Sequence, residues 1–218
     1  MTLPLKQTYI DRAKKHQDAD EIIQGKYWEN GRGCCIGCLA HANSNAHCEL
    51  EEQTNIPKWL SALADTIHEG LTKDDSKKWP LRFISAVPEQ VFTKAWTAIE
   101  IDKKIKAPFL IMVLQSALET FDHAKFPDVK AAIDGSIAIW ERDDIGSQEW
   151  KEAADAARAA DYAADYAADY AADAAARAAR AVAYAAARAV AYAAARAAAA
   201  AKYKYFSDQL VQIMESAV

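Results

Sequence analysis

Side chains that commonly bind metal ions are concentrated in one short stretch of this chain. Four such side chains are candidates. Three of them stand at positions i, i+4 and i+7, which places them on one face of a helix predicted for residues 34–42. The fourth follows the turn at residues 43–45. Zinc prefers thiolate and imidazole ligands in a tetrahedron. The pattern therefore predicts a structural zinc site, although it lacks the paired C-x2-C of zinc fingers. The candidate ligands are Cys34, Cys38, His41 and His47, with Cys48 as an alternative to the last.

Two other interpretations of these cysteines stay open. Without a metal, Cys34, Cys35 and Cys38 are small core residues, since free cysteine is often buried. Alternatively, Cys34 is a nucleophile, because it follows a glycine turn and begins a helix, whose dipole lowers the pKa of a thiol. The base would then be a histidine, His41, His47 or His68. No orienting Asn or Asp is recognisable.

The loop before Cys34 is the expected place for a ligand. Gly25, Gly31 and Gly33 punctuate it, and its candidate binding residues are two aromatic side chains and an arginine: Tyr27, Trp28 and Arg32. Binding residues are often found on loops. We expect any pocket to lie between this loop and the following helix, with Arg32 holding an anion. The alternative is that the loop only covers the core.

Helical periodicity dominates the remaining sequence, and no alternating strand pattern stands out. Pro57 suits the first turn of a helix that ends at Gly70, and Trp79-Pro80 opens another. We predict an all-α fold in which an N-terminal bundle of short helices positions the Cys/His segment. The predicted helices cover residues 9–24, 34–42, 47–53, 57–69, 79–84, 91–101, 108–121 and 129–140.

The last third of the chain is mostly alanine, written in repeats. Neither Gly nor Pro occurs between residues 147 and 218, so nothing obliges a helix to stop. A straight helix of this length would extend ~105 Å, whereas a compact chain of this size has a radius of gyration near ~17 Å. The segment is therefore one long helix that finds a partner or a helix that folds back. We place the domain boundary between residues 1–145 and 146–218.

One face of this Ala-rich segment, residues 146–218, collects charged and tyrosine side chains. They are either a solvated polar surface or a binding face for a protein or a small nucleotide-like ligand. The opposite Ala/Val stripe lets another helix approach closely, which permits a homodimer. The candidate binding residues are Asp161, Tyr162, Asp165, Tyr166, Asp169, Tyr170, Arg180, Tyr184 and Arg188.

Composition excludes several classes of protein. The 218 residues carry a net charge of -5 and a pI of about 5.6, which argues against general nucleic-acid binding. Residues 1–11 lack the apolar run of a signal peptide, and the longest apolar run outside the Ala-rich segment, 107–114, is too short to span a membrane. The clustered cysteines differ from a secreted disulfide framework. We expect a soluble cytoplasmic protein without a membrane segment.

The N-terminal motifs carry a resemblance. Residues 25–41 read GKYWENGRGCCIGCLAH and are followed by Ile56-Pro57, by IHEGL at 67–71 and by WPLRF at 79–83. They resemble a family of uncharacterised bacterial and bacteriophage proteins with a G-x-YW-x-x-G-x-GC-x-x-GC-x-x-H signature and an Ala/Tyr/Arg-rich helical C-terminus. Cys34, Cys38, His41 and His47 match the Cys and His positions of that pattern, whereas Cys35 departs from it. The resemblance implies a bacterial host and no particular activity.

A second resemblance concerns residues 129–176, whose helix, turn and Ala-rich continuation are similar to immunity proteins of bacterial toxin systems. We expect a non-enzymatic binding protein that blocks or sequesters a partner by stoichiometric occupancy, encoded by a phage or mobile element as an inhibitor of host defence. The first alternative is an immunity protein that neutralises a cognate bacterial toxin. The second is a small Cys- or zinc-dependent hydrolase that uses Cys34 and His41.

Overall fold

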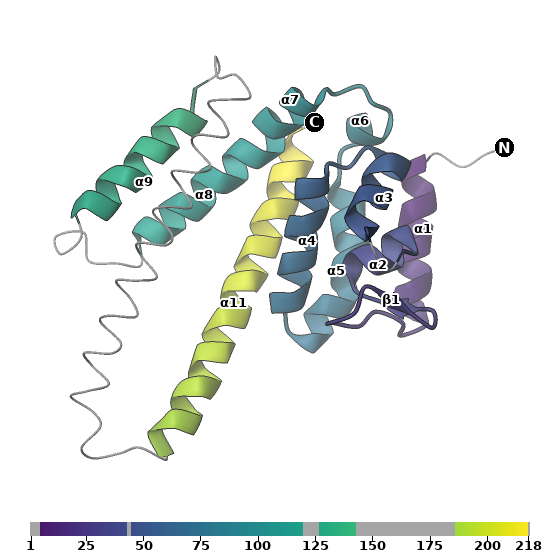
Figure 1. Cartoon of the computed structure of the whole chain (residues 1–218), viewed down its shortest axis with the longest axis horizontal. Coiled ribbons are helices and arrows are strands. Elements are labelled where there is room, and N and C mark those ends of the chain that lie inside the picture. Colours follow the sequence, from purple (N-terminus) through teal and green to yellow (C-terminus); the bar gives the residue numbers. More distant parts are fainter. Residues whose placement is uncertain (1–4, 43–44, 120–126, 143–185, 218) are drawn as a thin grey trace. The chain divides into compact units, whose positions relative to one another are not determined.

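The described part of the chain is helical, which confirms the predicted all-α class (Figure 1). A computed structural model gives the structure of residues 5–42, 45–119, 127–142 and 186–217. Contacts divide the chain into a first unit, Met1–Lys106 with Ala197–Val218, and a second unit, Ala107–Arg196. None of the helices described is both long and apolar enough to cross a membrane. The expected boundary near residue 145 lies outside the described residues.

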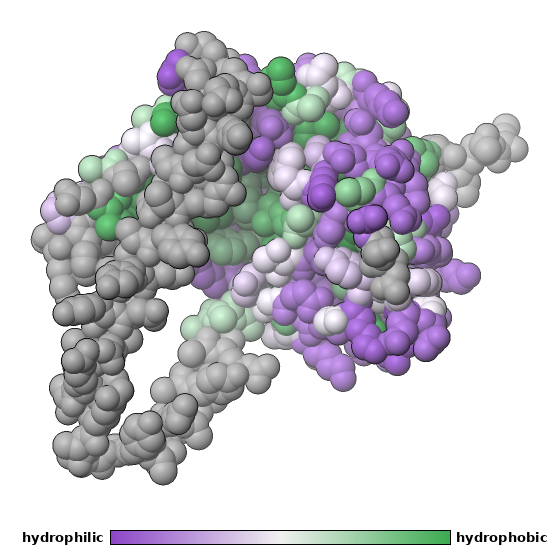
Figure 2. Space-filling model, in the orientation of Figure 1, coloured by the Kyte–Doolittle hydropathy of each residue, from purple (hydrophilic) through white to green (hydrophobic). Residues whose placement is uncertain are grey.

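The first unit is a bundle of short helices around a core that includes the fully buried side chains of Leu39, Leu60, Trp79 and Phe83. Hydrophilic side chains cover most of its visible face (Figure 2). Its elements are α1 (Leu5–Asp18), β1 (Trp28–Glu29), β2 (Arg32–Gly33), α2 (Cys35–Ala40), α3 (Ala46–Thr54), α4 (Lys58–Gly70), α5 (Lys73–Ala86), α6 (Glu89–Phe92), α7 (Ala98–Ile101) and the π-helix η1 (Asp102–Lys106).

Two predicted helices are shorter than expected because local backbone chemistry ends them. The first ends at Asp18, before Asp20 adopts a left-handed φ of 55°. The run predicted for 91–101 is interrupted, since Lys94 has a φ of 57° and a capping box at Thr97 starts α7 anew. The predictions for residues 19–24 and 93–97 are therefore wrong. The prediction that Trp79-Pro80 opens a helix is wrong as well, because α5 begins at Lys73 after the cap Thr72 and Pro80 lies inside it.

The glycine-rich loop forms an antiparallel hairpin with strands of two residues each, β1 and β2, which the sequence did not predict. Trp28 pairs with Gly33, and the turn between the strands uses a left-handed Asn30 and Gly31, with φ values of 52° and 81°. Behind the hairpin, the carbonyl oxygen of Tyr27 lies so close to α2 that a Cβ on Gly37 would be 1.4 Å from it. The hairpin therefore rests directly on α2 and needs glycine there.

The last helix, α11 (Ala186–Ser216), contributes its C-terminal half to the first unit, where it lies alongside α4 (Figure 1). Leu210, Val211 and Met214 are buried. The ring of Tyr203 covers Gly70, where an added Cβ would lie 2.2 Å from it. The structure does not describe residues 143–185. The question whether the Ala-rich segment is one helix therefore lies outside the described residues.

The second unit contains α8 (Ala107–Leu118) and α9 (Pro127–Trp140), which pack against each other. Ala107 and Trp140 are buried at their contact, and Leu110, Ile111 and Ile139 pack around them. The described residues of this unit therefore form a helical hairpin with a small apolar core.

Candidate functional site

The four predicted zinc ligands lie in different hydrogen-bonding environments. Cys34 and His47 face one cluster, whereas His41 lies with its Nε2 atom 2.7 Å from Nε2 of His16. The thiol of Cys38 donates to the carbonyl of Gly33 at 3.3 Å, and burial raises its pKa to about 12. Within the described ranges, no group of three or more His, Cys, Asp or Glu side chains is arranged to hold a metal ion. The zinc site stays a prediction.

Cys34 caps the N-terminus of α2, as the glycine turn before it predicts. Its sulfur accepts a hydrogen bond from the Gly37 amide at 3.4 Å, and the residue is only 2% exposed. Burial, together with the negative charge of nearby Asp65, raises the pKa of the Cys34 thiol well above its ordinary value. An activated nucleophile requires the opposite, a lowered thiol pKa and access to substrate. The Cys34 thiol therefore has the surroundings of a structural residue.

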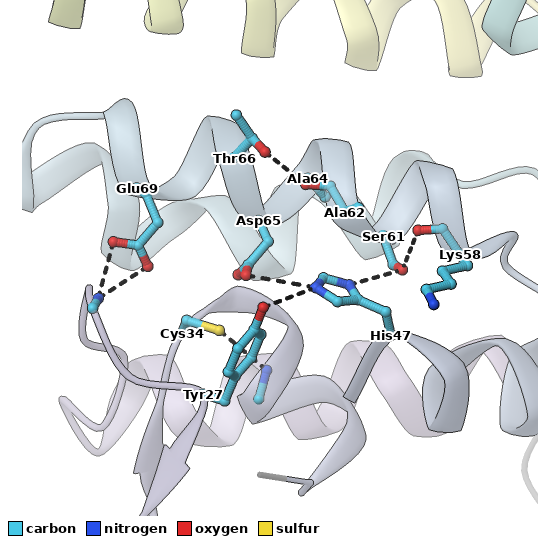
Figure 3. Close-up of polar contacts among 12 residues, drawn as sticks. Tyr27, Cys34, His47, Lys58, Ser61, Ala62, Ala64, Asp65, Thr66 and Glu69 are labelled. Carbon is cyan, nitrogen blue, oxygen red and sulfur yellow. Dashed lines mark hydrogen bonds and ion pairs between the residues drawn. The ribbon is translucent and has the colours of Figure 1, made fainter. Parts of the chain in front are cut away.

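His47 links the hairpin to α4 (Figure 3). The Ser61 hydroxyl donates to the Lys58 carbonyl at 2.9 Å, so its oxygen accepts from Nδ1 of His47 at 3.1 Å. Nε2 then accepts from the hydroxyl of Tyr27 at 3.3 Å. Burial lowers the pKa of His47 more than Asp65 raises it, which favours this neutral imidazole.

Asp65 completes this group, which we call the Cys34 cluster: Tyr27, Cys34, His47, Ser61 and Asp65. Oδ2 of Asp65 is 3.8 Å from Nε2 of His47, and Oδ1 is buried without a hydrogen-bond partner among the described residues. Sequence reasoning missed Asp65 and Ser61, although their i, i+4 spacing on the otherwise apolar face of α4 was a usable signal. The cluster joins the hairpin, the start of α2, α3 and α4, and it favours the protonated thiol of Cys34.

Trp28 covers the other side of the hairpin. Its ring stacks on His41 at 4.7 Å between centroids, and His16 meets it edge-on at 5.2 Å. Nδ1 of His16 lies 2.6 Å from a carboxylate oxygen of Glu21, and burial lowers the pKa of His41. Trp28 is thus engaged with the core. The Tyr27 carbonyl also approaches α2 closely at Gly37, and the pocket expected between loop and helix stays a prediction.

Arg32, the predicted anion anchor, lines a pocket on a different side of the loop. This cavity of about 360 Å³ lies between the loop that follows α1 and the first turns of α5. The partly exposed Ile23 supplies apolar surface, while Lys73 and Lys77 supply two further cations. We call it the basic pocket, and its lining residues are Asp20, Ile22, Ile23, Gln24, Arg32, Lys73, Ser76 and Lys77.

Hydrogen bonds fix the loop that forms one wall of the basic pocket. The side-chain amide of Gln24 donates to the carbonyls of His68 and Leu71 at 2.8 and 3.1 Å, at the C-terminal end of α4. The Glu69 carboxylate accepts from the Gly25 amide at 2.9 Å. Ile23 donates its amide to the carbonyl of Gly33 at 2.8 Å, which ties the loop to β2. The wall is therefore formed before any ligand arrives.

The electrostatics of the pocket are set by three cations and one carboxylate. Lys77 and Asp20 form an ion pair at 2.5 Å, and the guanidinium of Arg32 donates to the Asp20 carbonyl at 3.4 Å. The pKa of Asp20 is lowered, first by its hydrogen bond and ion pair with Lys77, and further by Arg32 and Lys73. All three positive charges thus act on the Asp20 carboxylate.

The predicted binding face of the Ala-rich segment is not part of the described structure. Arg188 lies within α11, but its side chain also falls outside the description. The remaining positions of that face precede α11: Asp161, Tyr162, Asp165, Tyr166, Asp169, Tyr170, Arg180 and Tyr184. Comparisons of the chain with models of protein families, with curated proteins and with solved structures give no match.

Proposed function

We propose that this protein is a non-enzymatic binding protein that sequesters a small anionic molecule in the basic pocket. The observation that carries the proposal is the convergence of Arg32, Lys73 and Lys77 on one cavity of about 360 Å³. Cavities of ~300–1,000 Å³ with a few placed polar groups are typical of small-molecule sites. The pre-formed wall reduces the ordering cost of binding.

The surroundings of the reactive groups support occupancy rather than chemistry. The described lining of the basic pocket includes no histidine or cysteine, and its one hydroxyl, on Ser76, is buried and donates to the carbonyl of Lys73 at 3.0 Å. The Cys34 thiol lies in its own cluster with a raised pKa. A hydrolase would need a nucleophile and a base within reach of the bound molecule.

Encoded by a phage or mobile element, as the sequence resemblance implies, such a protein would inhibit host defence by removing a small anionic ligand, such as a nucleotide, from solution. Its capacity would then be one ligand for each pocket. Inhibition of host defence is part of the proposal, and the identity of the bound ligand tests it.

The proposal is tested by native mass spectrometry after incubation with a mixture of anionic metabolites at low salt. We expect one anionic molecule bound per chain, its loss in Arg32→Gln, and release of a compound whose mass has not changed. Cys34→Ser serves as the control that retains binding. A released compound of altered mass would contradict the non-enzymatic assignment, and binding that survives Arg32→Gln would contradict the pocket.

A further inference from the structure

We propose, resting on the function above, that the basic pocket recognises the dianionic phosphate group of a phosphate monoester such as a nucleoside monophosphate. The pocket carries Arg32, Lys73 and Lys77 against the single carboxylate of Asp20. Its lining therefore has two positive charges in excess. A phosphate monoester carries nearly two negative charges at neutral pH, because its second pKa is about 6.

The types of cation suit this group. A guanidinium presents a planar fork of donors that matches two phosphate oxygens, and lysine ammonium groups act as mobile point charges. Arg32 and Lys73 are exposed, and Lys77 is partly exposed, with 34% of its side chain accessible. All three can therefore reach a group that enters from solution.

Asp20 acts as an internal counter-ion for Lys77. Its carboxylate holds Lys77 at 2.5 Å while 66% of its own side chain remains exposed, so the pair can open without uncovering a buried charge. An arriving phosphate competes with that carboxylate for Lys77. Because charge–charge energies scale with the product of the charges, Asp20 weakens the binding of a dianion more than that of a monoanion.

The partly exposed Ile23 gives the pocket some apolar surface, whereas Ile22 is only 2% exposed. A free phosphate ion uses none of that surface, whereas the organic part of a monoester covers some of it. The inference is therefore specific to a phosphorylated small molecule, and inorganic phosphate is expected to bind more weakly.

Isothermal titration calorimetry with three adenosine compounds tests the assignment. AMP carries a dianionic phosphate, cyclic AMP a monoanionic one and adenosine none. We expect AMP to bind at least about tenfold more tightly than cyclic AMP or inorganic phosphate, and adenosine to show no binding. The affinity for AMP should fall as the pH is lowered through the second pKa of its phosphate, about 6, while that for cyclic AMP stays constant.

Substitutions assign the effect to the pocket. Lys77→Gln should weaken AMP binding about tenfold, and Asp20→Asn should strengthen it about threefold. Asn tolerates the left-handed φ of 55° at this position. Lys78→Gln is the matched control, because Lys78 is the next residue of α5 but lines a separate cavity.

The outcomes separate the two proposals. If citrate binds in a manner that depends on Lys77 and AMP does not bind, the phosphate assignment is overturned and the anion-binding function stands. If inorganic phosphate binds as tightly as AMP, the pocket takes the free ion, and the monoester assignment fails. If none of these anions binds more tightly than adenosine, both proposals fail.

Discussion

Arg32 and Cys34 are two residues apart, and the fold gives them opposite surroundings. Arg32 is exposed on β2 and lines the basic pocket, whereas Cys34 is 2% exposed at the start of α2. A charged guanidinium keeps its hydration there and can exchange it for an anion. A desolvated thiol next to a carboxylate stays protonated. At the residue scale, therefore, the proposed anion binding depends on Arg32, whereas Cys34 has the surroundings of a structural residue.

The cysteines should differ in their reaction with iodoacetamide. We expect the partly exposed Cys48 to be alkylated first and Cys34 to remain unmodified in the folded protein at about pH 8, since burial and a raised thiol pKa both slow its reaction. Peptide mass mapping after timed labelling measures the order. Unfolding in urea is the control and should make both cysteines reactive. Preferential labelling of Cys34 in the native state would instead support the nucleophile interpretation.

The stability of the fold should fall in mildly acidic solution. Burial lowers the pKa values of His41 and His47 below the ordinary 6.5, so the unfolded chain binds their protons more tightly. The free energy of unfolding is then highest above pH 6.5 and decreases as the pH falls through that value. Urea unfolding at a series of pH values between about 7.5 and 5.5 measures the slope. His47→Gln should reduce it, and an unchanged slope would contradict our account of His47.

At the scale of elements, close approach of the hairpin to α2 positions both the Cys34 cluster and the basic pocket. The Tyr27 carbonyl faces α2 where Gly33 and Gly37 leave room for it, and β2 carries Arg32 outward. The loop of the basic pocket pairs with the same strand through Ile22 and Gly33. One short hairpin thus links the buried cluster to the exposed pocket.

Adding a methyl group at Gly37 should separate the hairpin from α2. A Cβ there would lie 1.4 Å from the Tyr27 carbonyl oxygen, a backbone atom that cannot move by itself. We expect Gly37→Ala to lower the free energy of unfolding by about 1–3 kcal/mol or more, measured by chemical denaturation. The matched control is Gly135→Ala on α9, where an added Cβ would have no described atom within 4 Å apart from its chain neighbours and the backbone of its own helix. It should stabilise α9 by about 0.5–1 kcal/mol, and equal effects of the two substitutions would contradict the packing described.

Local sequence signals predict most of the described helices, because hydrophobic periodicity and capping residues act over a few positions. The turn before Cys34 was also accessible from the sequence, and anion binding by Arg32 stays a prediction. The Cys34–Asp65 proximity was not, since these residues are 31 positions apart. The position of the pocket also depends on α5, whose Lys73 and Lys77 approach the loop only through tertiary packing. Local sequence patterns thus do not predict which residues distant in the sequence lie close together.

At the scale of the whole molecule, the first unit is built from two separate parts of the chain, Met1–Lys106 and Ala197–Val218. The C-terminal half of α11 buries Leu210 and Met214, and Asp208 forms ion pairs with Arg82 and Lys204. Hydrogen bonds to Arg82 and Lys204 hold the pKa of Asp208 below its ordinary value, although burial opposes them. The first unit is therefore complete only with residues 197–218.

Truncating a buried side chain on α11 should destabilise the first unit. Met214 is fully buried, so we expect Met214→Ala to cost about 2–5 kcal/mol of unfolding free energy. Gln212→Ala, at an exposed position two residues away, is the control and should change stability by less than about 0.5 kcal/mol. Chemical denaturation of both variants provides the comparison. A small cost at Met214 would mean that the end of α11 contributes little to the unit.

The central claim, that the protein holds a small anion in the basic pocket without reacting with it, is tested most directly by a crystal structure of the protein grown with AMP. We expect the phosphate group within hydrogen-bond distance of Arg32 and at least one of Lys73 and Lys77, with an intact ligand and an unmodified Cys34 thiol. An empty pocket, a phosphate bound elsewhere or a covalent adduct on Cys34 would contradict the account.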